Sequence, residues 1–341
     1  MPIEVKNISC RYGEKTPLEV QALRKISFQV EDGEFIGIMG HTGCGKSTLL
    51  QMIAGLISPE EGQIFIDGRD IGAPDYDRET LRRTLGIVFQ YPENQLFEET
   101  VEKDVAFALK CSGLSRAEKE ERVRQALEAV GFGRESGIDR RKERAGKSGV
   151  FPDKDTSGGG RDDAGREFAD KGGLLQGQGC AGKGRILQWQ DIARKSPLTL
   201  SGGEKRRVAI AGVLAARPRI LLFDEPLAGL DPYGRQEFLE LAARLHSQGT
   251  TILMVSHDAD ALCGYADRIL VLDRGELSAD GTPEEVFADL QRAEMLHIGA
   301  GNIRQIARKL YEKGMIANPA VIKYDTLINE IKAMLKAGEE P

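Results

Sequence analysis

The chain of 341 residues has few cysteines and no long hydrophobic run. No segment approaches the ~18 consecutive apolar residues that a transmembrane helix needs, so we expect any membrane contact to pass through a partner. The first residues, Met1–Val5, lack the charged and then apolar pattern of a secretory signal. The five cysteines are scattered without a C-x-x-C pair, which argues against a disulfide framework or zinc site and favours a reduced, cytosolic compartment.

The chain also lacks an excess of basic residues. It has 47 Lys and Arg against 53 Asp and Glu, a formal net charge of −6 and a pI near 5.5. Binding to nucleic acid depends on basic residues that neutralise phosphates, so we expect no nucleic-acid partner. Hydrophobic residues make up 40% and charged residues 29%, which is typical of a globular protein with a substantial core and two or three structural units.

Short β-branched and aromatic segments alternate with helical segments along most of the chain. The expected strands are 3–10, 26–30, 34–39, 63–67, 85–90, 220–223, 251–255 and 269–272. This alternation predicts an α/β fold with a largely parallel sheet covered by helices.

Residues 133–185 interrupt the alternation. This stretch holds fourteen glycines, many charges of both signs and few large apolar side chains. It buries too little to offset its ordering entropy, so we expect a disordered or loosely ordered insertion. A passive surface insertion is favoured over a regulatory or partner-binding role. Further along, helical patterns at 302–314 and 324–336 predict a small appended unit.

A complete G-x-x-x-x-G-K-[ST] loop follows the expected strand 34–39 and opens a helix. Glycines let backbone N–H groups converge on phosphate oxygens at the helix N-terminus. In such a loop Lys46 bridges the β- and γ-phosphates, and Ser47 offers its hydroxyl to Mg²⁺. The alternative, a chance match, is disfavoured by the strand–helix context. The loop residues are Gly40, His41, Thr42, Gly43, Cys44, Gly45, Lys46 and Ser47.

Polar side chains follow three other expected strands. Asp224 ends one strand, where a carboxylate can coordinate Mg²⁺ through water, and Glu225 is the candidate to orient or deprotonate the attacking water. His257 and Gln90 follow two further strands. Because strand ends at one edge of a parallel sheet converge, we expect Asp224, His257 and the phosphate loop to meet. The alternatives are a surface Asp-Glu pair and a structural histidine.

Residues Leu200–Glu204 read Leu-Ser-Gly-Gly-Glu and open another helix. We expect Ser201 to cap this helix and Glu204 to close a capping box. The N–H groups of Ser201, Gly202 and Gly203 form a candidate anion site for a γ-phosphate, unless the segment is only a helix start. The phosphate loop already surrounds the nucleotide of its own chain, so we expect these residues to act in trans on a two-fold partner.

Together these motifs resemble the ATP-binding cassette (ABC) family over roughly residues 1–132 and 196–285. In this resemblance 40–47 is the Walker A loop, 220–225 the Walker B strand and 200–204 the signature motif. The resemblance also makes Gln90 the Q-loop residue and His257 the switch histidine. It places Asp231 in the D-loop, 228–231, and makes Tyr12 the aromatic residue that stacks on adenine. It implies ATP and Mg²⁺ as ligands, extends the nucleotide-binding residues to Thr48, and makes Ser47, Gln90 and Asp224 the metal ligands.

The fold that this resemblance implies is a P-loop NTPase of the ABC ATPase type. Such a protein has a RecA-like core, an antiparallel β subdomain, an α-helical signature subdomain and, here, a small C-terminal helical extension. We expect the ATPase domain at 1–289, with its helical subdomain at about 91–216. The extension at 290–341 is expected to help two ATPases dimerise.

Finer features are similar to the ATPases of energy-coupling factor (ECF) transporters. The similar segments are 89–97, 99–101, 104–107 and 206–215, and residues 16–18, 22–23 and 40–43 suggest the second of two ATPase paralogues. The resemblance implies a heterodimer with the first paralogue and a transmembrane scaffold subunit that docks near Gln90–Phe97. It also implies indirect contact with a substrate-capture membrane protein and a peripheral position on the cytoplasmic face of the cell membrane.

The expected function is ATP hydrolysis that energises uptake of a vitamin or metal ion through closure of an ATPase dimer, with Glu225, His257 and Gln90 as catalytic residues. The chain departs from the family pattern in its 133–185 insertion, in Glu204 where glutamine is usual, and in Leu227 where a small polar residue is commoner. The rivals are a soluble ABC ATPase acting on ribosomes or DNA, and a nucleotide-sensing regulatory subunit. A single cassette with net negative charge argues against the first, and the intact polar set argues against the second.

Overall fold

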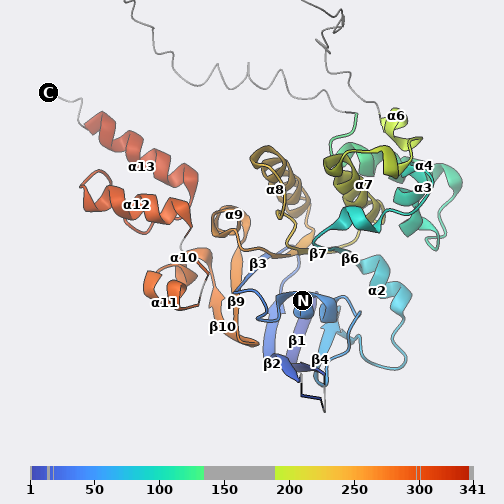
Figure 1. Ribbon diagram of the computed structural model, residues 1–341, viewed down its shortest axis with the longest axis horizontal. Helices are drawn as coiled ribbons and strands as arrows, with labels where there is room; N and C mark the ends of the chain where they lie inside the picture. Colours follow the sequence, from blue (N-terminus) through green and yellow to red (C-terminus); the bar gives the residue numbers. More distant parts are fainter. Residues whose placement is uncertain are drawn as a thin grey trace, which may run out of the picture.

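Two β-sheets and a peripheral set of helices build the chain (Figure 1). The computed structural model describes residues 2–13, 16–17, 19–133, 189–296, 298–299 and 301–337. Apart from Gly133, the predicted insertion at 133–185 lies outside the described residues. No helix in the described part of the chain has both the length and the apolar character to cross a membrane.

The larger sheet has six strands in the order β10-β9-β3-β8-β7-β6. The five strands from β9 to β6 run parallel, and β10 is antiparallel to β9. Every residue of β3, β7 and β8 is buried, as expected for strands covered on both faces. The bounds are β3 Phe35–Met39, β6 Leu85–Val88, β7 Ile220–Asp224, β8 Thr251–Val255, β9 Arg268–Asp273 and β10 Glu276–Gly281.

The smaller sheet is antiparallel, with the order β2-β1-β4-β5. Its strands are β1 Ile3–Tyr12, β2 Val20–Val30, β4 Glu61–Ile66 and β5 Arg69–Asp70. Apolar residues of this sheet share a core with Leu49 and Leu50 of α1 (Lys46–Ile53). Strand β2 begins six residues earlier than the expected strand 26–30, because Val20, Gln21 and Leu23 also pair with β1, although only Ala22 and Leu23 in this stretch are buried.

A helical lobe lies beside β6 (Figure 1). Its helices are α3 Val101–Ala106, α4 Arg116–Ala129, α6 Trp189–Ala193 and α7 Gly202–Ala215, with the short 3-10 helices η1 Pro92–Gln95, η2 Phe107–Leu109 and η3 Pro197–Thr199. The lobe has an apolar core that includes Val105, Leu127 and Val208. Helices α3 and α4 are separate, because Ser115 and Glu118 form a capping box that starts a new helix.

The remaining helices cover the sheet or follow it. They are α2 Arg78–Thr84, α8 Pro232–Ser247, α9 Ala259–Tyr265, α10 Pro283–Val286, α11 Leu290–Met295, α12 Asn302–Glu312 and α13 Tyr324–Ala337. Helices α12 and α13 lie side by side, apart from the sheet (Figure 1). They pack on a small core of Ala307, Ile316, Val321 and Leu327.

The C-terminal helices are anchored to α9 by one carboxylate. Asp260 Oδ2 accepts hydrogen bonds from the backbone N and the Nδ2 of Asn302, at 2.8 and 3.0 Å, and Oδ1 accepts one from the backbone N of Ile303 at 3.1 Å. A carboxylate that accepts from the first N–H groups of a helix caps it and favours its dipole. Residue Asp260 of the core therefore fixes where α12 begins.

Candidate functional site

The phosphate loop joins β3 to α1, as the sequence predicts. Gly45 has φ +102°, and a Cβ there would lie 2.4 Å from the carbonyl oxygen of Ala22. The Lys46 side chain is buried, and its Nζ donates to the carbonyl oxygens of Gly40 and His41 at 2.8 and 2.9 Å. The fold thus holds an ammonium group inside a loop of backbone N–H donors, which is an arrangement suited to phosphate oxygens.

Ser47 and Asp224 meet directly at the first turn of α1. Ser47 Oγ donates to Asp224 Oδ1 at 3.0 Å. Burial raises the pKa of the Asp224 carboxyl, while the Ser47 hydrogen bond and the Lys46 charge oppose the rise. No group of three or more His, Cys, Asp or Glu side chains among the described residues is arranged to hold a metal ion by itself, so a Mg²⁺ ion held here would complete its shell with water and phosphate oxygens.

The carboxyl ends of three neighbouring strands converge on this point. Asp224 of β7 pairs in register with Val255 of β8, and Glu225 N donates to Val255 O at 3.1 Å. Ser256 N, at the end of β8, donates to the carbonyl oxygen of Ile38 in β3 at 3.2 Å. The prediction that these strand ends meet beside the phosphate loop is confirmed.

Glu225 and His257 form a close polar pair. His257 Nε2 lies 3.0 Å from Glu225 Oε1, which has no well-aligned hydrogen-bond donor in the described residues. Burial raises the pKa of Glu225 to about 7; the Asp224 charge adds to the rise and the Lys46 charge opposes it. Burial, and then the Lys46 charge, lower the pKa of His257. The pair therefore offers a proton acceptor near neutral pH beside a neutral imidazole.

The backbone of Glu225 is itself unusual. Its φ is +50°, in the left-handed region that few non-glycine residues occupy. Such a conformation persists where the surrounding structure holds it, often at functional sites. Here the N–H of Glu225 donates to Val255 of β8, so the backbone at Glu225 is fixed relative to the end of that strand.

The other predicted loop residues take different positions. Thr42 and Gly43 are exposed, while Cys44 is buried in the core, so its side chain faces away from solvent. His41 Nε2 lies 3.3 Å from Asp273 Oδ1 at the end of β9. In the loop, Thr42, Gly43 and Cys44 therefore offer a ligand mainly backbone groups.

Tyr12 and Gln90 lie at opposite sides of this region of the chain. The Tyr12 hydroxyl donates to Thr48 Oγ1 at 3.3 Å, which places its half-exposed ring against the start of α1. Gln90 is exposed directly after β6, and the chain then turns into η1. An exposed aromatic ring beside the phosphate loop is suited to stack on an adenine base. The assignment of Gln90 as a metal ligand stays a prediction.

The segment Leu200–Glu204 opens α7 with the predicted capping box. Ser201 Oγ and Ser201 N both donate to Glu204 Oε2, at 2.7 and 2.9 Å, and the serine hydroxyl is the main cause that lowers the pKa of Glu204. Ser201, Gly202 and Gly203 are exposed. Within the described ranges no hydrogen bond joins them to the phosphate loop of the same chain.

Asp231 caps a different helix. Its Oδ1 accepts from Gly234 N at 2.6 Å at the start of α8. Its predicted contact with nucleotide stays a prediction.

Sequence reasoning missed Arg206, a buried residue of α7. Its Nη1 donates to the carbonyl oxygen of Ala228 at 2.9 Å, and its Nη2 donates to that of Pro226. Burial lowers the pKa of Arg206, and the Glu93 charge in η1 opposes this. In the sequence, Arg206 lies one helical turn before the apolar Ile210 and so on the same face of the helix. A charged residue on an apolar helix face was the signal that could have indicated its burial.

Comparisons with known proteins agree with this geometry. The ABC transporter family profile matches residues 23–162 and 180–228. An energy-coupling factor transporter ATP-binding protein EcfA2 from Caldanaerobacter subterraneus subsp. tengcongensis is 39% identical over 337 residues, covering 98% of each chain. The EcfA2 protein of Symbiobacterium thermophilum is 38% identical over 346 residues and covers both chains fully.

Solved structures show the same fold. CbiO1 from Clostridium perfringens, described as part of the ABC transporter complex cbiONQ, has a TM-score of 0.61 and 30% identity, covering 92% of this chain and 97% of that one. The dimeric ATP-binding cassette MJ0796 bound to ADP and Pi has a TM-score of 0.59 and 25% identity, covering 82% and 98%. This chain therefore belongs to the ABC transporter family, as an ATP-binding protein of the energy-coupling factor type whose ATP hydrolysis is coupled to transport.

Proposed function

We propose that this chain is one half of an ATPase dimer that drives uptake of a vitamin or metal ion. The observation that carries the proposal is that Ser47 contacts Asp224 next to the Glu225–His257 pair, while the start of α7, the candidate anion site, is exposed. The chain thus holds one complete phosphate site and one half-site that faces outward. Two copies of such a subunit, or two paralogues, can complete each other.

Binding of ATP rests on the loop 40–47 and its neighbours. Backbone N–H groups and the Lys46 ammonium receive the phosphates, and Thr48 lies at the same helix start. The Tyr12 ring lies where an adenine can stack against it. Bound Mg²⁺ neutralises phosphate charge, and Ser47, Asp224 and Gln90 are the residues that would hold it.

Hydrolysis requires that a water molecule be oriented and lose a proton. With a pKa near 7, the Glu225 carboxylate can accept that proton at physiological pH. The neutral imidazole of His257 lies 3.0 Å from the carboxylate and can fix its position or donate to a γ-phosphate oxygen. Both groups follow the ends of the neighbouring strands β7 and β8, which pair in register.

Closure of a dimer supplies the remaining contacts. Ser201, Gly202 and Gly203 of one subunit would meet the γ-phosphate held by the other, with Asp231 near the interface. We assign 1–289 to the ATPase domain and 290–341 to an extension that supports dimerisation. The second subunit is in this proposal a paralogue, and the complex lies on the cytoplasmic face of the membrane.

The surface formed by Gln90–Phe97 is the proposed docking site for a transmembrane scaffold subunit. Tyr91 is exposed, and Phe97 is exposed while its ring packs edge-on against Phe107 at 4.9 Å between centroids. Exposed aromatic side chains are typical anchors of protein interfaces. Because Gln90 connects this surface to the strand end of β6, nucleotide state can be transmitted to the partner.

Substitution of Glu225 by glutamine tests the assigned chemistry. We expect Glu225→Gln to lower ATP turnover by roughly a hundredfold or more while ATP binding is retained, since only the proton acceptor is lost. Phosphate release and nucleotide binding measure the two effects. Glu120→Gln, at an exposed position of α4, is the control and should behave as wild type. Full ATPase activity of Glu225→Gln would refute the role of Glu225.

Purification from detergent-solubilised membranes tests the transport assignment. Integral membrane proteins that co-purify with the chain support it, whereas co-purifying ribosomes or DNA would support the rival soluble ATPase. A chain that binds ATP without hydrolysing it in the presence of its partners would support a regulatory subunit instead.

A further inference from the structure

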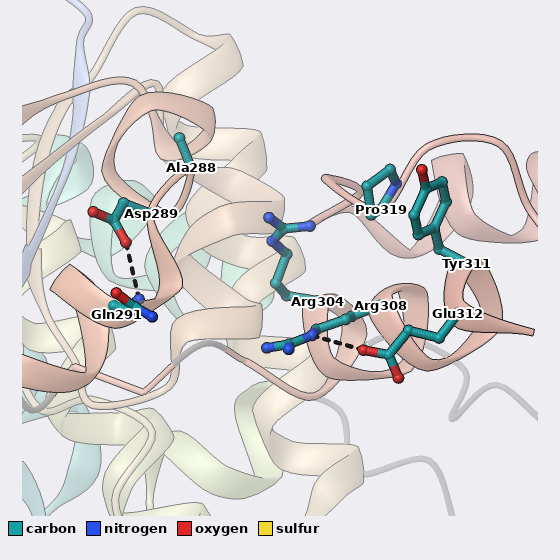
Figure 2. A pocket seen from close by; sticks show the side chains of 8 residues that line it. All are labelled: Ala288, Asp289, Gln291, Arg304, Arg308, Tyr311, Glu312 and Pro319. Carbon is teal, nitrogen blue, oxygen red and sulfur yellow. Dashed lines mark hydrogen bonds and ion pairs between the residues drawn. The ribbon is translucent and has the colours of Figure 1, made fainter.

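A hollow of about 530 Å³ lies where the ATPase core meets the C-terminal helices (Figure 2). Its walls come from three segments: the chain from the end of α10 into the start of α11, one side of α12, and the loop that leads to α13. None of these residues belongs to the nucleotide site. The volume is in the range of pockets that take small ligands.

The guanidinium of Arg304 is the unusual feature of this hollow. The residue is only 7% exposed, and its Nε and Nη1 are buried without a hydrogen-bond partner in the described part of the chain. Burial lowers the pKa of Arg304, and the nearby Arg308 charge lowers it further. A buried charged donor without a partner is costly, so a group that satisfies it has a strong reason to bind.

The acidic side chains around the hollow are engaged elsewhere. Arg308 Nε is 3.0 Å from Glu312 Oε1, and Asp289 Oδ1 accepts from the backbone N of Gln291 at 3.0 Å. Figure 2 shows Arg308 turned toward Glu312, whereas Arg304 rises from α12 into the space between Ala288 and Pro319. No carboxylate of the described residues forms an ion pair with Arg304.

We propose that this hollow binds a small organic oxyanion, whose carboxylate or phosphate group is received by Arg304. Guanidinium groups donate charge-assisted hydrogen bonds to both kinds of group, and a small reorientation of the Arg304 side chain toward the ligand would give its buried nitrogens a partner. Tyr311 also lines the hollow, and the Ala288 and Pro319 side chains provide apolar surface for the body of the ligand.

The position of the site gives the ligand a regulatory role. An anion in the hollow contacts the core turn and α12 together, so it fixes the C-terminal helices relative to the ATPase core. The same helix is capped by Asp260 of α9, which begins directly after His257 and Asp258.

Thermal unfolding of the full chain with citrate or inorganic phosphate tests the proposal. Ionic strength is held constant with sodium chloride, and wild type is compared with Arg304→Met and with Lys309→Met. Lys309 is exposed on the same helix outside the hollow, so its replacement removes the same charge. The phosphate loop is present in all three proteins, so its response to phosphate cancels in the comparison.

We expect the anion, at a hundredfold excess over its Kd, to raise the Tm of wild type and of Lys309→Met saturably, by roughly 4 °C or more beyond any rise in the Tm of Arg304→Met. In anion-free buffer Arg304→Met should be at least as stable as wild type, which shows that it folds. An equal response of Arg304→Met, or no difference between any of the three proteins, would overturn the proposal. If instead wild type does not respond and Arg304→Met weakens dimerisation alone, the guanidinium receives a carboxylate of a partner subunit and the small-ligand proposal is wrong. ATPase activity, measured in parallel, reports on the proposed function separately.

Discussion

Ser47 Oγ donates a hydrogen bond to Asp224 Oδ1 at 3.0 Å, across 177 positions of sequence. Ser47 lies in the first turn of α1 and Asp224 ends β7, so the contact joins the phosphate loop to the carboxyl end of a central strand. A hydroxyl and a carboxylate oxygen at one place are hard ligands of the kind that Mg²⁺ prefers. The chemistry of the site therefore depends on a long-range contact between two short motifs.

Replacement of Ser47 tests its proposed place in the metal shell. Ser47→Ala should raise the Mg²⁺ concentration needed for half-maximal ATPase activity by about tenfold or more, because one oxygen ligand is lost. Ser47→Thr keeps the hydroxyl and should stay near wild type. Titration of Mg²⁺ at fixed ATP measures the effect, and an unchanged Mg²⁺ requirement in Ser47→Ala would remove Ser47 from the metal site.

The raised pKa of Glu225 predicts a pH-dependent stability of the nucleotide-free protein. Folding raises this pKa from its ordinary value of 4.5 to about 7, so the folded form binds the proton more tightly than the unfolded form. The resulting stabilisation is complete below pH 4.5 and is lost as the pH rises through 7. The side chain of Glu225→Gln cannot lose a proton. The free energy of unfolding of this variant, relative to that of wild type, should therefore rise between pH 5 and pH 8, by up to about 3 kcal/mol.

Urea unfolding at pH 5 and pH 8 measures this difference. Glu120→Gln removes a similar charge from an exposed helix position and serves as the control. A stability difference between Glu225→Gln and wild type that does not change with pH would contradict the burial of this carboxyl.

Replacement of the acidic residue at position 204 should strengthen ATP-dependent dimerisation. The Ser201 hydroxyl lowers the pKa of Glu204, so the side chain is negative at neutral pH beside the proposed anion site. Glu204→Gln keeps an acceptor for Ser201 N and removes the charge, which should strengthen ATP-dependent dimerisation by roughly two- to fivefold. Sedimentation at increasing ATP measures dimer formation, and Glu118→Gln in the matching capping box of α4 is the control. A weaker dimer with Glu204→Gln would show that the charge is needed.

Two glycines of the phosphate loop predict contrasting outcomes. Gly45 has φ +102° and no room for a Cβ, which would lie 2.4 Å from Ala22 O, whereas Gly43 has φ +84° but open space around it. Gly45→Ala should distort the loop and abolish ATP binding, because backbone atoms would have to move. Gly43→Ala should cost only about 1–2 kcal/mol of backbone strain and retain weakened binding. Equilibrium binding of ATP and thermal unfolding measure both, and equal losses in the two variants would contradict the contrast.

Short-range patterns in the sequence were enough to predict the motifs that carry the chemistry. The loop at 40–47, the capping box of Ser201 and the strand ends before Asp224 and His257 each depend on a few neighbouring residues, and the structure has each of them. The resemblance that these motifs carry also predicted the family and the fold. Local propensity did not predict the first half of β2 or strand β10, because these segments become strands by pairing with β1 and β9.

Only the tertiary structure decided how these pieces act on one another. The raised pKa of Glu225, the carbonyl contacts of Arg206, the capping of α12 by Asp260 and the unpaired guanidinium of Arg304 all follow from burial and from contacts between distant segments. A sequence lists which groups can ionise or donate, but the free energy of a charge depends on how much water and which partners surround it. That environment is set by packing, and packing exists only once the chain is folded.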